Sequence, residues 1–132
     1  MLVLTIRSDK PEAEIGLFDD KNKLQYTTWE ADRKLGVTIH QKIEEVLNSQ
    51  SKSLKDLEGI VGFEGPGSFT GLRIGLTVAN TLAQQLQIPI AGSTGENWIE
   101  TGVHDLKTLQ RVELKIALPK YGRGAHITTP KK

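Results

Sequence analysis

The sequence predicts an α/β fold with a mixed β-sheet, built from an antiparallel meander and a strand–helix–strand unit. Two observations carry this prediction. Residues 2–30 contain three short apolar or alternating runs separated by tight polar turns, which is typical of strands that pair antiparallel. Residues 59–91 contain a buried apolar run, a glycine-rich loop, a helical pattern and a second apolar run. That order requires a crossover connection and therefore parallel strands.

The first half of the chain supplies the meander and one helix. The apolar, β-branched run 2–7 predicts the first strand, and the runs 13–18 and 23–30 predict the next two. The polar residues 19–22 between the last two runs predict a tight turn. Apolar residues then recur at a spacing of three and four, which predicts an amphipathic helix over residues 36–50.

The second half of the chain supplies the parallel part of the sheet. Ser53 is placed to cap a single short turn ahead of a buried strand. After that turn the predicted elements are, in order, a strand at 59–63, a helix at 71–86, a strand at 88–91, a short helix within 94–102 and a last strand at 111–118.

Length and composition exclude several classes of protein. The chain has 132 residues, about one domain, and 37% of them are apolar, with 13 glycines in addition. No apolar run approaches the ~18 residues of a membrane span, and the N-terminus is too short and too poor in charge for a signal peptide. The absence of cysteine excludes disulfides, thiolate zinc sites and cysteine nucleophiles. We expect a cytoplasmic protein without a membrane partner.

Charge is balanced over the whole chain but unevenly placed. The chain has 17 basic and 16 acidic residues, yet residues 103–132 contain seven basic and two acidic ones. The segment 120–132 contains four basic residues and no acidic residue. Two interpretations stay open: a solvated basic tail, or a contact with an anionic partner such as RNA.

The segment 64–75, EGPGSFTGLRIG, is the most informative part of the sequence. It follows a strand and opens a helix, where free backbone N–H groups can bind an anion. The P-loop pattern fails because no lysine stands at the helix start, and the dinucleotide pattern fails because position 70 is threonine. The residues that could contact phosphate are Gly65, Gly67, Ser68, Thr70 and Arg73. The alternative is purely structural, with Ser68 or Thr70 capping the helix.

The helix at 71–86 is apolar nearly all round, which predicts that more than one of its faces is covered. Gly71, Gly75 and Ala79 recur every four residues and form a small-residue stripe that another backbone can approach. One face can pack on the sheet, and we expect a partner protein to cover the other. The predicted interface comprises this stripe with Val78 and Leu82, and with Ile39 and Ile43 from the first helix.

The run GPGSFTGLRIG at 65–75, continued by Ala79, Leu82 and Ala83, closely resembles the TsaB (YeaZ-like) family. The segment IPIAGST at 88–94 is similar to the strand that follows this helix in that family. The resemblance covers about residues 2–100 and implies an actin- or Hsp70-like half-domain with a degenerate nucleotide site.

The resemblance also implies a function. Family members are non-catalytic dimerisation subunits that pair with the catalytic subunit TsaD and help to recruit the ATPase TsaE. The complex transfers a threonylcarbamoyl group to N6 of adenosine 37 in tRNA, so contact with tRNA is indirect. Pairing uses two helices from each protein, and some members form homodimers through the same surface. The resemblance implies no firmly bound cofactor, with ATP or ADP expected only at the interface of the complex.

The sequence departs from the family in two places. The family's first strand usually ends in Asp-Thr, whereas Arg7-Ser8 stands here. A Mg²⁺–phosphate site needs a carboxylate there, which argues against independent ATP hydrolysis. The family also usually continues into a second domain. We expect residues 1–102 to form the half-domain, residues 103–132 to supply the final strand and a basic tail, and the second domain to be absent.

Two other functions stay open. The chain could be a small actin-fold ATPase or kinase that uses the 65–71 loop for phosphate, or a stand-alone homodimeric scaffold. The three histidines, at positions 40, 104 and 126, lack zinc-ligand spacing, and Ser68 lacks the Gly-x-Ser-x-Gly context of a hydrolase nucleophile. We therefore expect no catalytic residue and no metal site in this chain.

Overall fold

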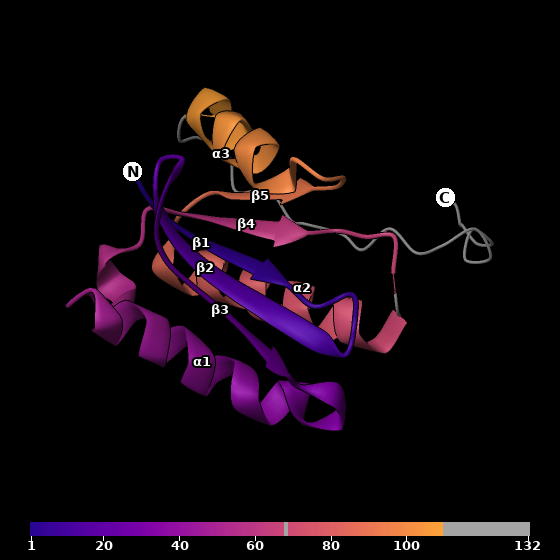
Figure 1. The fold of residues 1–132 in the computed structure, drawn as a ribbon. Helices are drawn as coiled ribbons and strands as arrows, with labels where there is room; N and C mark the ends of the chain where they lie inside the picture. The colour runs from indigo at the N-terminus through magenta and orange to yellow at the C-terminus, as the bar shows by residue number, and fades with distance from the viewer. Residues whose placement is uncertain (68, 110–132) are drawn as a thin grey trace.

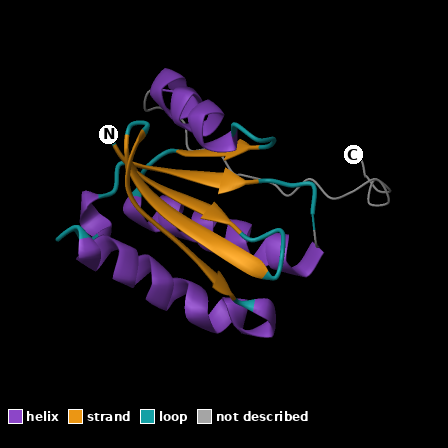
Figure 2. Ribbon diagram, in the orientation of Figure 1, coloured by secondary structure: helices purple, strands orange, loops and turns teal. Residues whose placement is uncertain are grey.

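A five-stranded mixed sheet forms the centre of the molecule, in the order β3-β2-β1-β4-β5, with helices on both faces (Figure 1). The computed structural model describes residues 1–67 and 69–109. Figure 2 shows the element types along this part of the chain, and the mixed sheet is the one that the sequence predicts.

The first three strands form the predicted antiparallel meander. They are β1 (Leu2–Arg7), β2 (Glu12–Asp19) and β3 (Asn22–Glu30). Asp20 in the β2–β3 turn has φ 58, a left-handed conformation that aspartate tolerates better than most residues. A register shift between Leu17 and Phe18 marks a β-bulge opposite the exposed Leu24.

The parallel part of the sheet consists of β1, β4 (Gly59–Phe63) and β5 (Ile90–Ser93). The predicted strand at 88–91 begins two residues too early. Gln87 adopts φ 57, and the N–H of Ile88 donates to the carbonyl of Ala83, so these residues close the preceding helix. The strand can start only after this cap and Pro89.

Three helices cover the sheet: α1 (Leu35–Ser49), α2 (Phe69–Leu86) and α3 (Trp98–Leu109). Gly62 of β4 faces Leu76 and Ala79 of α2, whereas Val61 faces Gly102 of α3. Because successive side chains of a strand point to opposite faces, α2 and α3 lie on opposite faces of the sheet. α1 packs against β2, β3 and α2, and so lies on the same face as α2 (Figure 1).

Helix α3 differs from the short helix predicted within 94–102. It begins at Trp98 because Gly95, with φ +87, keeps the preceding residues in a turn. It runs on to Leu109, with Val103 and Leu106 fully buried. Helix α3 therefore extends beyond residue 102, the predicted end of the half-domain. The predicted strand at 111–118 lies outside the described residues.

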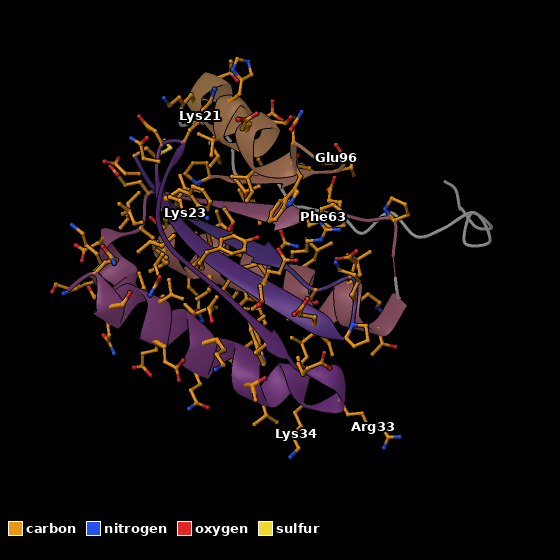
Figure 3. All side chains as sticks on the ribbon, in the orientation of Figure 1. Lys21, Lys23, Arg33, Lys34, Phe63 and Glu96 are labelled. Carbon is orange, nitrogen blue, oxygen red and sulfur yellow. The ribbon has the colours of Figure 1, made fainter. Side chains whose placement is uncertain are left out.

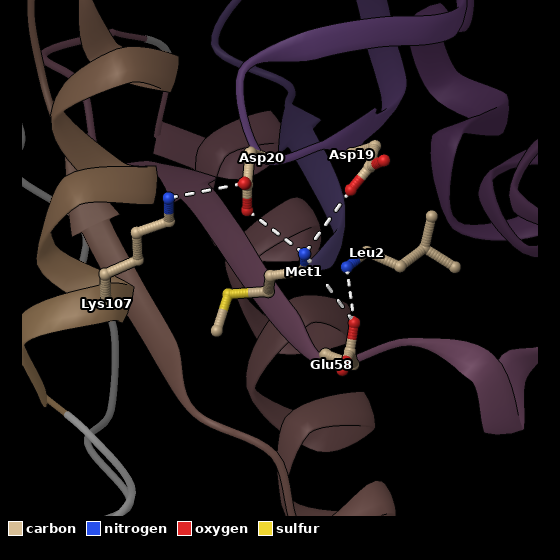
Figure 4. Close-up of polar contacts among 6 residues, drawn as sticks. All are labelled: Met1, Leu2, Asp19, Asp20, Glu58 and Lys107. Carbon is tan, nitrogen blue, oxygen red and sulfur yellow. Dashed lines mark hydrogen bonds and ion pairs between the residues drawn. The ribbon is translucent and has the colours of Figure 1, made fainter.

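The start of β1 is tied to both neighbouring loops and to α3 by charged groups (Figure 4). The Met1 amine lies 3.0 Å from Asp20 Oδ1, and Lys107 Nζ of α3 lies 3.3 Å from the other oxygen of that carboxylate. The Leu2 N–H donates to Glu58 at 2.7 Å. The hydrogen bond with Asp20 raises the pKa of the Met1 amine above its usual value.

The 3₁₀-helix η2 (Leu54–Asp56) is the short turn predicted at Ser53. Ser53 and Asp56 form a capping box in which the Ser53 N–H donates to the Asp56 carboxylate at 2.9 Å. None of the described helices is long and apolar enough to cross a membrane.

Candidate functional site

The glycine-rich loop lies at the carboxyl edge of the parallel strands and packs tightly against the residues after β1. Gly65 has φ 108 and is followed by a cis bond to Pro66, a backbone geometry that favours glycine. Gly67 lies against Asp9, so any side chain at position 67 would overlap the Asp9 side chain. The backbone of this loop is therefore held against β1.

Arg7 occupies the end of β1, where the resemblance leads one to expect a carboxylate. Its Nε donates to Asp9 Oδ1 at 2.7 Å and its Nη2 donates to the other carboxylate oxygen at 3.3 Å. Its guanidinium also lies 3.9 Å from the centre of the Phe63 ring, which in turn contacts Trp98 edge-on. Figure 3 shows Phe63 at the carboxyl end of β4. A bidentate ion pair on an aromatic stack thus fills this edge of the sheet.

The electrostatics of this edge favour a permanently charged Arg7. Burial by itself lowers the pKa of Arg7, but the hydrogen bond and charge of Asp9 outweigh it and raise that pKa above its usual value. On the same face of the sheet the Tyr26 hydroxyl donates to Glu14. Burial and this hydrogen bond both raise the pKa of Tyr26, so the phenol stays protonated.

Sequence reasoning identified Arg7 but missed Asp9 and Phe63, which complete its surroundings. The signal for Asp9 is present, because a carboxylate two residues after the strand lies within reach of the Arg7 side chain. Phe63 is the last residue of β4, one position beyond the Ile6–Gly62 pair of the parallel ladder. Its contact with Arg7 depends on that register, which the sequence does not state.

The predicted phosphate-contact residues lie in the loop and on the first turns of α2. Gly65 and Gly67 lie in the loop at the carboxyl edge, whereas Thr70 and Arg73 are exposed on α2 and line a shallow hollow over its outer side. Ser68 lies outside the described residues. Phosphate contact by these residues stays a prediction.

The small-residue stripe of α2 faces the sheet. A side chain at Gly75 would overlap Ser8, and Ser8 Oγ donates to the carbonyl of Gly71 at 2.7 Å. Ala79 is fully buried next to Gly62 of β4. The stripe therefore allows α2 to approach β1 and β4 closely, which corrects the expectation that its close approach serves a partner.

Two further residues of the predicted interface lie beneath the helices. Ile39 is 0% exposed and Ile43 is 3% exposed, because both point from α1 to the sheet. Leu82 is also buried, at the side of α2 that faces α1. Of the seven predicted residues, Val78 and Gly71 keep partial exposure. The interface remains a prediction. Because most of the seven residues are buried, we expect the contacting residues on the outward side of both helices.

That outward side carries Val78, which belongs to the predicted interface, and two apolar residues that the predicted interface leaves out, Val37 and Ile74. Val37 of α1 is 78% exposed, and Ile74 and Val78 of α2 are half-buried beside the hollow of about 350 Å³. Val37 lies two residues from buried Ile39, which places it on the opposite side of the helix. We call Val37, Ile74 and Val78 the outer face.

The sequence matches the family described as "TsaD: tRNA N6-adenosine threonylcarbamoyltransferase" over residues 29–99, more than half of the chain. The chain belongs to this family. It is 35% identical over 106 residues to the tRNA threonylcarbamoyladenosine biosynthesis protein TsaB of Bacillus subtilis, which covers 79% of this chain and 46% of that protein. These matches confirm the resemblance to TsaB.

Two further proteins are similar to this TsaB-like chain. It is 35% identical over 98 residues to the tRNA N6-adenosine threonylcarbamoyltransferase of Geotalea uraniireducens, which covers 74% of this chain and 28% of that protein. The solved structure of YeaZ from Pseudomonas aeruginosa superposes with a TM-score of 0.65 at 22% identity, over 70% of this chain and 43% of YeaZ. This superposition confirms the actin-like half-domain. The chain spans less than half the length of each of these relatives.

Proposed function

We propose that this TsaB-like chain is a cytoplasmic, non-catalytic subunit that pairs with a TsaD-type catalytic subunit in the formation of N6-threonylcarbamoyladenosine at position 37 of tRNA. The observation that carries the proposal is the outer face, which consists of exposed Val37 on α1 and half-buried Ile74 and Val78 on α2, two helices that pack against each other. Val37 is the most exposed large apolar side chain among the described residues.

The outer face has the layout of a helix-packing surface. Ile74, Val78 and Leu82 follow one another at a spacing of four and form one ridge on α2. Leu82 closes this ridge against α1, so the ridge runs along the valley between the two helices. A pair of helices from a partner can pack against such a ridge and valley. The proposed pairing therefore uses the same two helices as the sequence predicts, but their outward residues.

The carboxyl edge supports a subunit that does not carry out the transfer. Asp9 lies two residues after the end of β1, and both of its oxygens accept hydrogen bonds from Arg7. A Mg²⁺–nucleotide needs free carboxylate oxygens and would meet the Arg7 cation at this edge. These residues do not fit such a ligand, so the chemistry belongs to the partner. A TsaE-type ATPase and tRNA, contacted indirectly, complete the proposed assembly.

A titration with the TsaD-type subunit of the same organism tests the proposal, with the mass of the complex read by light scattering. We expect a complex of the two chains, and we expect Val78→Asp or Ile74→Asp to weaken it at least about tenfold. Gln84→Asp, an exposed change on the other side of α2, is the control. No complex with the wild-type chain would overturn the proposal. ATP turnover by the purified chain would favour an actin-fold ATPase, and self-association alone would favour a homodimeric scaffold.

A further inference from the structure

A groove of about 450 Å³ lies beside the outer face, between the second half of α1, the helix η2 and the last turns of α2. Buried side chains form its floor: Ile43 and Leu47 from α1, and Leu82 from α2. Leu54 of η2 lines it and is 40% exposed, one of few large apolar side chains exposed among the described residues. The groove is therefore an apolar trough with one exposed leucine beside it.

Cations outnumber anions around this trough. Lys52, Lys55 and Glu44 line it. Lys52 also lines a second hollow together with Asp56 and Glu58, so carboxylates near its ammonium group offset its positive charge. No acidic group lies within ion-pair distance of Lys55 among the described residues. The hydrogen bond from the Ser53 N–H and, more weakly, the charges of Lys52 and Lys55 lower the pKa of the nearby Asp56 carboxylate. Asp56 therefore acts on Lys55 without forming an ion pair with it, and the Lys55 ammonium can still pair with an anion from outside.

The groove continues the ridge of the outer face. Leu82 forms part of its floor and follows Val78 by four residues, a rise of about 6 Å along α2. A helix packed against Ile74 and Val78 therefore reaches the groove within about one further turn. The two surfaces can be covered by one continuous segment of a partner.

We propose that this groove receives a segment of the TsaD-type subunit in which an apolar side chain is followed or preceded by a carboxylate. The apolar side chain fills the trough over Leu82 and contacts Leu54, and the carboxylate pairs with Lys55. The proposal rests on the proposed function, because it names the chemistry of the partner at one end of the same interface.

Charge favours this occupant over a second copy of the chain. In a two-fold pairing centred on the groove, Lys52 and Lys55 of both copies would come together with only one lining carboxylate, Glu44, from each copy. Like charges at such a contact disfavour association. A partner with a carboxylate at this point has no such penalty.

Two pairs of variants test the proposal by titration with the TsaD-type subunit at low and high salt, about 0.05 M and about 0.5 M. Lys55→Glu should weaken binding about tenfold at low salt, and the loss should shrink at high salt because it is electrostatic. Lys10→Glu, an equal charge change at the opposite edge of the sheet, is its control.

Leu54→Ser should weaken binding about threefold to tenfold at both salt concentrations. Leu24→Ser is its control, at another exposed leucine that lines the second hollow and not the groove.

The outcomes separate this proposal from the proposed function. If the wild-type chain forms no complex, the proposed function fails. If the wild-type chain binds and Lys55→Glu binds equally well at low salt, the carboxylate assignment is wrong. If both groove variants leave binding to the TsaD-type subunit unchanged but reduce self-association, the occupant is a second copy, and the proposal is overturned.

Discussion

The two sides of helix α2 differ in the size of their apolar residues and in what those residues contact. The inward side carries Gly75 and Ala79 and lies against β1 and β4, while the outward side carries the branched residues Ile74 and Val78. A stripe of small residues shows only that another backbone comes close. In this chain that backbone is the end of β1, so the small residues belong to the fold, and the larger apolar residues are the ones that the proposed pairing uses.

The largest expected effect tests the inward side. Gly75→Leu should reduce the free energy of unfolding by about 3 kcal/mol, because the new side chain overlaps Ser8 and the surrounding strand end cannot move freely. The gain in helix propensity offsets at most ~1 kcal/mol of the steric cost. Urea unfolding followed by circular dichroism measures this loss.

A matched change on the outward side sharpens the comparison. Thr77→Leu lies on the exposed side of the same helix and should change stability by less than about 0.5 kcal/mol. The smaller change Gly75→Ala should cost less when Ser8 is also replaced by alanine, since Ser8 Oγ is the first atom it meets. Equal stability of Gly75→Leu and the wild type would show that the stripe is not packed against β1.

The next effect concerns the ion pair at the carboxyl edge, near the start of α2. Arg7→Ala should cost about 2 kcal/mol of stability, because it leaves the buried Asp9 carboxylate without its partner and removes the contact with Phe63. Arg7→Lys should recover only part of this loss, since an ammonium cannot form the bidentate pair. Arg7→Ala combined with Asp9→Asn should be more stable than Arg7→Ala alone, and the reverse order would contradict the ion-pair account.

A change on the outer face should separate binding from folding. Val37→Asp should leave stability within about 0.5 kcal/mol of the wild type, because the side chain is 78% exposed and an acidic residue is favourable near a helix N-terminus. Affinity for the TsaD-type subunit should fall about tenfold as a charge enters the interface. Parallel unfolding and titration experiments measure both, and a stability loss without a binding loss would place Val37 in the fold.

The smallest effect is expected at the N-terminal charge cluster. The pKa of the Met1 amine is raised above 8.0, so its contribution to stability is full below about pH 8 and is lost as the pH rises through the raised value. The hydrogen bond with that amine lowers the pKa of Asp20 below 3.8, so its contribution is lost only in stronger acid. Asp20→Asn should lower the urea midpoint slightly at pH 6 and less at pH 10. If Asp20→Asn lowers the urea midpoint equally at both pH values, the charge of the Met1 amine does not contribute to stability through Asp20.

Much of the fold follows from the sequence because its signals are local. The helices predicted at 36–50 and 71–86 lie within two residues of α1 and α2, and the three meander strands are found in place. The start of β5 was wrong because a left-handed Gln87 prolongs the helix cap, and no residue type at that position signals it.

The candidate site was harder to predict than the fold because it depends on which side of a helix faces the sheet. Periodicity identified α2 as apolar on several sides, but it did not show that Gly75 meets Ser8 or that Ile39 and Ile43 lie beneath α1. Those facts depend on contacts between segments that are 30 to 70 positions apart in the chain, for example the 63 positions between Ser8 and Gly71. Val37 was the one clear signal passed over, an exposed valine on the opposite side of the helix from Ile39.

The attachment of α2 at both ends has a kinetic consequence for recognition. Ser8 holds Gly71 near its start, and the cap at Gln87 and Ile88 closes its last turn. In the proposed pairing, a partner would meet a helix that is already held in place, and little conformational entropy would be lost when the ridge is covered. Association needs no rearrangement of this helix, so variants of the outer face should differ mainly in the lifetime of the complex rather than in how fast it forms.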